Sequence, residues 1–84
     1  MNQHERLTQE WAKTGQNALI GKKIIAVRYL TEEEQSDLMW HSKCVVITLD
    51  DGTLIFPSQD DEGNDAGALY YQTTDQLNVL PVIN

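Results

Sequence analysis

The stretch of sequence that decides the fold is Val45-Val46-Ile47-Thr48-Leu49-Asp50-Asp51-Gly52-Thr53-Leu54-Ile55-Phe56. It holds two runs of β-branched and apolar residues, which are typical of strands. Between them, Asp51-Gly52 suits the two positive-φ positions of a type I′ turn. The sequence therefore predicts a β-hairpin with a two-residue loop, in which Leu49 faces Leu54 and Ile47 faces Phe56. In this register Val45 joins the same apolar face, and the half-apolar opposite face carries Val46, Thr48 and Ile55.

Three more strands are predicted outside this hairpin. Residues 24–30 form an apolar, β-branched run before it, and residues 68–72 and 77–83 form two runs after it. Pro81 cannot donate to a strand ladder, so the last run is expected at an edge. Five short, mostly antiparallel strands favour a meander that curls into a small barrel. Residues 17–84 are thus predicted to be a single small β-barrel domain.

One helix is predicted between the first strand and the hairpin. Thr31-Glu32-Glu33-Glu34 has capping-box spacing, in which the Thr31 hydroxyl accepts a hydrogen bond from the Glu34 amide. We expect a helix over about residues 32–40 that buries Leu38 and Met39. Because it is short, packing rather than helix propensity must stabilise it.

Residues 1–16 are predicted to be an N-terminal helix or a flexible arm. Asn2 and Glu5 have capping-box spacing, and Gly15 suits the end of a helix. The segment is otherwise polar, so it either lies against the domain or frays. A docked helix would use two apolar residues one turn apart, Leu7 and Trp11.

Several of these segments resemble a family of small, uncharacterised bacterial proteins. The residues that carry the resemblance are LIGKKI at 19–24, YLTEEE at 29–34, Trp40, and LDDGTLIFPSQDDEGN at 49–64. The resemblance covers roughly residues 19–70. It implies an SH3-like barrel and no assigned reaction, cofactor or partner. The expected fold class is therefore α+β, mainly β: a small five-stranded antiparallel SH3-like barrel with a short helix inserted after the first strand.

Charge is divided unevenly along the chain, whose net charge is −7. All six Lys and Arg lie before residue 44, whereas residues 44–84 hold seven acids and no Lys or Arg. Nucleic acids and anionic membranes both recognise basic surfaces, so neither is an expected partner. No apolar run approaches the roughly 20 residues that span a bilayer, and no signal peptide is recognisable. The expected location is the cytoplasm.

The acidic loop, residues 58–67, follows Pro57 and is the first place to look for a function. Asp60, Glu62 and Asn64 alternate as oxygen ligands do at the start of an EF-hand loop. The match fails, because the glycine and glutamate that an EF-hand requires further along are missing and strands are predicted on both sides. A different hard-cation site, a solvated turn, and a recognition loop for a basic partner remain as alternatives. The candidate binding residues are Gln59, Asp60, Asp61, Glu62, Asn64, Asp65 and Trp40.

His41 and Cys44, three residues apart, offer the other candidate chemistry. A zinc site needs three or four ligands, and His4 is the only other histidine. A Cys/His nucleophilic pair needs contact and a third group that orients the histidine. The alternative without any chemistry is that His41 lies in a helix-to-strand turn and Cys44 is a buried, inert thiol. The sequence thus predicts no catalytic residue, no metal site and no cofactor.

The favoured function is a non-enzymatic protein-interaction module that presents the acidic loop to a basic protein segment. The segregated charge supports this, because it can steer a cationic partner. A small-molecule or metal-binding protein that uses residues 58–67 is one alternative. Another is a structural homodimer, formed through the half-apolar face with Val46 and Ile55 or through an uncovered edge strand. The chain itself is expected to be a monomer or a weak homodimer.

Overall fold

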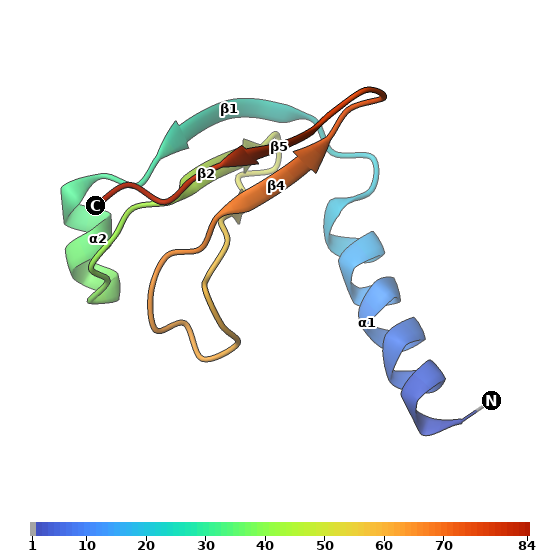
Figure 1. Cartoon of the computed structure of the whole chain (residues 1–84). Coiled ribbons are helices and arrows are strands. Elements are labelled where there is room, and N and C mark those ends of the chain that lie inside the picture. The colour runs from blue at the N-terminus through green and yellow to red at the C-terminus, as the bar shows by residue number, and fades with distance from the viewer. Residues whose placement is uncertain (1) are drawn as a thin grey trace.

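The computed structural model describes residues 2–84, which form two helices and five strands (Figure 1). In chain order these are α1 (Gln3–Leu19), β1 (Ile24–Tyr29), α2 (Glu32–Leu38), β2 (Val45–Leu49), β3 (Leu54–Ile55), β4 (Leu69–Gln72) and β5 (Leu77–Leu80). All strands pair antiparallel, in one sheet of order β1-β2-β3 and a separate β4-β5 hairpin. The α+β class is confirmed. The described residues form no closed barrel, and α1 alone has 17 residues, so a mainly-β SH3-like barrel is not confirmed.

The predicted β2–β3 hairpin is present, but its register differs by one residue. Ile47 pairs with Ile55 and Thr48 pairs with Leu54. Ile55 therefore shares a face with Ile47, so the predicted division of the hairpin into faces is wrong. Val46 is fully buried, which removes it from any surface available to a second chain.

The register changes because the turn has three residues rather than two. The Leu49 amide donates to the Thr53 carbonyl oxygen at 2.9 Å, which leaves residues 50–52 in the loop. Gly52 has a φ of 90°, whereas Asp51 does not take the positive φ that a type I′ turn requires. The Asp51 carboxylate instead accepts the Thr53 amide and forms an ion pair with Lys22.

Helix α2 begins at the predicted capping box and ends earlier than predicted. The Thr31 hydroxyl accepts from the Glu34 amide at 3.1 Å, and the Glu34 carboxylate accepts from the Thr31 amide at 2.9 Å. Met39 then adopts the left-handed conformation (φ 59°) and is 84% exposed, and Leu38 is also exposed. The prediction that these two residues are buried is wrong. The left-handed residue reverses the chain and buries Trp40 instead.

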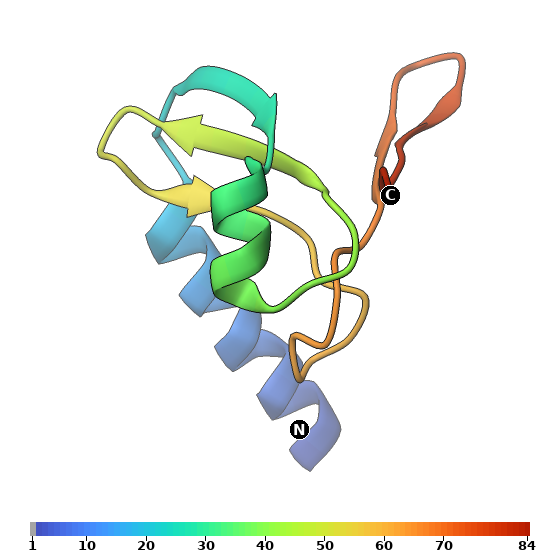
Figure 2. The same cartoon turned by 90° about the vertical axis from the view of Figure 1, so that its left-hand side faces the viewer.

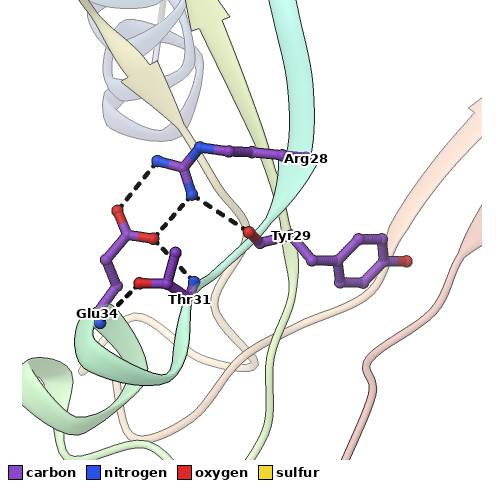
Figure 3. A network of polar contacts seen from close by, with 4 residues as sticks. All are labelled: Arg28, Tyr29, Thr31 and Glu34. Atoms are coloured by element: carbon purple, nitrogen blue, oxygen red, sulfur yellow. Dashed lines mark hydrogen bonds and ion pairs between the residues drawn. The ribbon is translucent and has the colours of Figure 1, made fainter.

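An ion pair joins α2 to β1 (Figure 3). The guanidinium of Arg28 donates to both carboxylate oxygens of Glu34, at 2.7 and 3.0 Å. The same carboxylate accepts the Thr31 amide, so one side chain caps α2 and holds it to the sheet. These hydrogen bonds, led by those from Arg28, lower the pKa of Glu34 to about 2.

The main core cluster lies on the face of the β1-β2-β3 sheet that α2 covers (Figure 2). Its members come from the ends of β1 and α2, from β2, and from the end of the acidic loop: Leu30, Trp40, Cys44, Val46 and Ala66. Val45 and Leu49 of β2 are buried on the opposite face. Burial raises the pKa of the Cys44 thiol, as expected for an inert cysteine.

Helix α1 projects from the start of β1 (Figure 1). Asn2 caps it by accepting from the Glu5 amide at 2.8 Å, as predicted. The helix continues past Gly15, where its end was predicted, and the chain turns only at Gly21, which has a φ of 83°. None of its residues is buried, so docking by Leu7 and Trp11 is not observed. No helix within residues 2–84 is long and apolar enough to cross a membrane.

The β4–β5 hairpin stands apart from the three-stranded sheet (Figure 2). It is tied to the rest of the protein by the residues that follow β5. Lys43 and Ile83 exchange backbone hydrogen bonds of 2.7 and 2.9 Å, and the Tyr29 hydroxyl donates to the Pro81 carbonyl oxygen at 2.8 Å. These contacts hold the base of the hairpin and leave its far end free.

Candidate functional site

The acidic loop is closed at its neck by backbone contacts between Ser58 and Ala66. The Gln59 amide donates to the Asp65 carbonyl oxygen, and the Gly67 amide donates to the Pro57 carbonyl oxygen, both at 3.0 Å. A Cβ atom at Gly67 would lie 2.7 Å from the carbonyl carbon and oxygen of Ser58. Glycine therefore permits the close approach of the two chain segments that shape the loop.

Asp60 organises the interior of the loop. One of its carboxylate oxygens accepts the amides of Glu62 and Asn64, each at 3.1 Å, and the other accepts the Asn64 side-chain amide at 2.8 Å. These contacts, with the Asn64 side chain first, lower the pKa of Asp60. Both oxygens are therefore engaged in holding the loop.

Asp65 ties the loop to the segment that follows α2. Its Oδ1 atom accepts three backbone amides, from Ala66 at 2.8 Å and from His41 and Ser42 at 3.1 Å. The Ala66 amide is the main cause of the lowered pKa of Asp65. This carboxylate therefore connects two segments that lie more than 20 residues apart in the sequence.

Trp40 supports the loop from inside. Its Nε1 donates to the Gly63 carbonyl oxygen at 2.7 Å, and its ring meets Phe56 edge-to-face with the centroids 5.9 Å apart. Trp40 is 7% exposed, so it offers almost no surface to a partner. The predicted link between Trp40 and the loop is thus present, but the tryptophan has a structural role.

The structure brings all seven predicted site residues together and divides them by role. Four of them hold the loop in shape: Trp40, Asp60, Asn64 and Asp65. The remaining three are exposed: Gln59, Asp61 and Glu62. Across residues 2–84, no three His, Cys, Asp or Glu side chains are grouped so that they could hold a metal ion.

A surface hollow that the sequence did not suggest lies between α1 and the acidic loop. Trp11 and Asp61 line it. Trp11 is 72% exposed, which is unusual for so large an apolar side chain. Fifty residues separate the two, so no sequence spacing could have shown that they share one site.

A second cavity, of about 200 Å³, lies between α2 and the β2–β3 hairpin. Its lining is apolar except for two carboxylates of α2: Leu30, Glu34, Asp37, Leu38, Val46, Leu54 and Phe56. It is smaller than the roughly 300 Å³ at which small-molecule sites begin, so it has room for little more than one side chain.

Comparison of the chain with models of protein families, with curated proteins and with solved structures found no match.

Proposed function

We propose that this protein is a non-enzymatic interaction module that binds a basic protein segment through the acidic loop and Trp11. The observation that carries the proposal is the surface hollow that the exposed Trp11 and Asp61 line together. A cation is attracted to the face of an indole ring and to a carboxylate. A lysine or arginine side chain satisfies both at once.

The internal bonding of the loop supports the same proposal. Asp60 and Asp65 hold its backbone, while Asp61 and Glu62 stay exposed at its surface. A loop that is ordered before binding loses little conformational entropy when a partner arrives. The excess of acids in residues 44–84 also steers a basic partner toward this part of the chain.

We also propose that the strands belong to an SH3-like barrel. The backbone pairing of Lys43 with Ile83 supports it, because it brings the C-terminal segment back to the start of β2. A cytoplasmic location is likewise proposed, in keeping with the single buried cysteine.

Titration of the full chain with a short Lys- and Arg-rich peptide, followed by NMR, tests the proposed function. We expect saturable shifts in the Trp11 indole and in the amides of residues 59–66, and weaker binding as salt is added. Trp11→Leu should weaken binding about three- to fivefold, which corresponds to an exposed cation–π contact. Asp61→Asn with Glu62→Gln should weaken it further.

The matched control is Glu32→Gln with Glu33→Gln, which removes the same charge from exposed residues of α2. Unchanged binding in this control, with loss in the loop variant, supports a localised site. Equal loss in both variants, or the absence of saturable shifts in the wild-type chain, contradicts the proposal.

A further inference from the structure

The cavity between α2 and the β2–β3 hairpin, which we call the α2 cavity, has apolar walls that solvent can reach. Its volume is about 200 Å³. Two of its lining residues, Leu30 and Val46, are buried in the core, whereas Leu38, Leu54 and Phe56 are 37, 45 and 38% exposed. An apolar stem that enters from outside would therefore contact three accessible side chains.

The two carboxylates of the α2 cavity differ in what they already bind. Glu34 accepts from the guanidinium of Arg28 through both of its oxygens (Figure 3). The other ion pair within residues 2–84 joins Lys22 to Asp51. Asp37 therefore has no cationic partner in this part of the chain, and its side chain is exposed. The α2 cavity thus presents one free carboxylate beside an apolar wall.

The position of Asp37 in α2 makes a free carboxylate there unfavourable. It is the last residue but one of the helix, and the last turn contains no basic residue. The negative end of the helix dipole repels a carboxylate and attracts a cation. Within α2, three more acids and no Lys or Arg accompany it. Local structure therefore does not account for an acid at this position, whereas a cation bound beside it would.

Apolar walls together with one free carboxylate select a side chain that has an aliphatic stem and a cationic tip. Long basic side chains lay their stems along apolar surface and keep the charged group at its edge. Lysine suits a cavity with room for little more than one side chain, because it has a flexible four-carbon stem and a compact ammonium group. Arginine has a shorter stem and a wider planar head, and an apolar side chain leaves Asp37 unpaired.

We propose that the α2 cavity is a binding site for one lysine side chain of a partner protein. The stem packs against the apolar walls, and the ammonium group pairs with Asp37. This site is additional to the hollow at Trp11 and Asp61, with which it shares no lining residue. The two sites can therefore be tested separately.

Titration of the full chain with three short, end-blocked glycine peptides, followed by NMR, tests the site. The peptides carry one lysine, one arginine, or one norleucine, which has the carbon stem of lysine without the ammonium group. We expect the lysine peptide to cause the largest saturable shifts in the methyl groups of Leu38 and Leu54. Asp37→Asn should weaken its binding about two- to fivefold, which corresponds to one exposed ion pair.

The matched control is Glu33→Gln, which neutralises an exposed carboxylate of α2 that does not line the cavity. This control should bind the lysine peptide as wild type does. An arginine or norleucine peptide that binds as tightly as the lysine peptide overturns the proposal. Equal loss of binding in Asp37→Asn and Glu33→Gln also overturns it.

Asp61→Asn separates this site from the one in the proposed function. It should leave the shifts of Leu38 and Leu54 unchanged. Shifts confined to Trp11 and residues 59–66 would support the proposed function and overturn the lysine site. Shifts confined to the α2 cavity would support the lysine site and contradict the proposed function.

A second measurement needs no ligand. Because Asp37 lies unpaired at the negative end of α2, Asp37→Asn should keep or raise the thermal midpoint of the full chain. A lower midpoint would show that Asp37 is bound within the protein itself, and this result overturns the proposal.

Discussion

The indole Nε1 of Trp40 donates a 2.7 Å hydrogen bond to the carbonyl oxygen of Gly63, at the exposed end of the acidic loop. Trp40 belongs to the core, whereas Gly63 has a φ of 73° and lies among acids. The shape of the most charged part of the surface is therefore coupled to the packing of the interior. Changes in the core should consequently be detectable in the loop.

Replacement of Trp40 by phenylalanine tests this coupling. Trp40→Phe removes the hydrogen bond to Gly63 and part of the buried ring, so we expect a loss of about 1–2 kcal/mol in the free energy of unfolding. Hydrogen exchange should accelerate in the amides of residues 59–66. The control, Trp11→Phe, changes an exposed ring and should stay within about 0.5 kcal/mol of wild type. Unchanged exchange in the loop of Trp40→Phe argues against the coupling.

Two glycine-to-alanine substitutions should have opposite effects. At Gly67 the new Cβ meets the Ser58 backbone at 2.7 Å, so Gly67→Ala should destabilise the protein by about 1–3 kcal/mol. At Gly15 nothing lies within 4 Å and the residue is inside α1, so Gly15→Ala should favour the helix by about 0.5–1 kcal/mol. Urea denaturation measures the first change, and helical circular dichroism measures the second. If Gly67→Ala matches wild type, the close approach of the loop ends is wrong.

The ion pair between Arg28 and Glu34 predicts a loss of stability in acid. The pKa of Glu34 falls from 4.5 to about 2 on folding, so between these values the unfolded chain binds more protons than the folded chain. The stabilisation is therefore present above pH 4.5 and is lost as the pH falls toward 2. The urea midpoint of wild type should fall over this range, and that of Glu34→Gln should fall less.

Glu33→Gln is the control for that measurement, because it makes the same chemical change one residue earlier in α2. Its acid profile should follow that of wild type. A Glu34→Gln profile parallel to wild type would show that the ion pair does not contribute.

The acidic loop should not respond to hard divalent cations. Both oxygens of Asp60 are hydrogen-bonded within the loop, and Asp65 accepts three backbone amides. Titration with calcium or magnesium should therefore leave the NMR shifts of residues 59–67 unmoved. Saturable shifts in this segment would restore the hard-cation alternative. Asp60→Asn would then test whether Asp60 coordinates the cation, because a metal site that loses a carboxylate ligand binds the metal more weakly.

Local signals explain which elements could be predicted. The capping box of Thr31 and Glu34 forms as its spacing predicts, because all its hydrogen bonds lie within one helical turn. Turns were less predictable. Asp51-Gly52 is compatible with more than one turn, and in the turn that forms Asp51 also pairs with Lys22, 29 residues away. Met39 ended α2 early for a related reason, since the burial of Trp40 required the chain to reverse there.

In the candidate site too, the sequence predicts local features of the acidic loop but not its contacts with distant residues. Its composition and its position after Pro57 are evident from the sequence, as is the charge that suggests a basic partner. The role of each acid is not evident, because Asp65 takes two of its three amides from residues 41 and 42. Trp11 could not be assigned to the site, since only the placement of α1 makes it line the same hollow as Asp61.

The sequence by itself determined the order of helices and strands, the cap of α2, the existence of the β2–β3 hairpin and the sign of the surface charge. These depend on interactions among residues close together in the chain. Tertiary structure alone decided the register of that hairpin, the separation of β4 and β5 into their own sheet, and the division of the loop into structural and exposed acids. Each of those depends on contacts between distant segments, whose free energies outweigh the small differences between local alternatives.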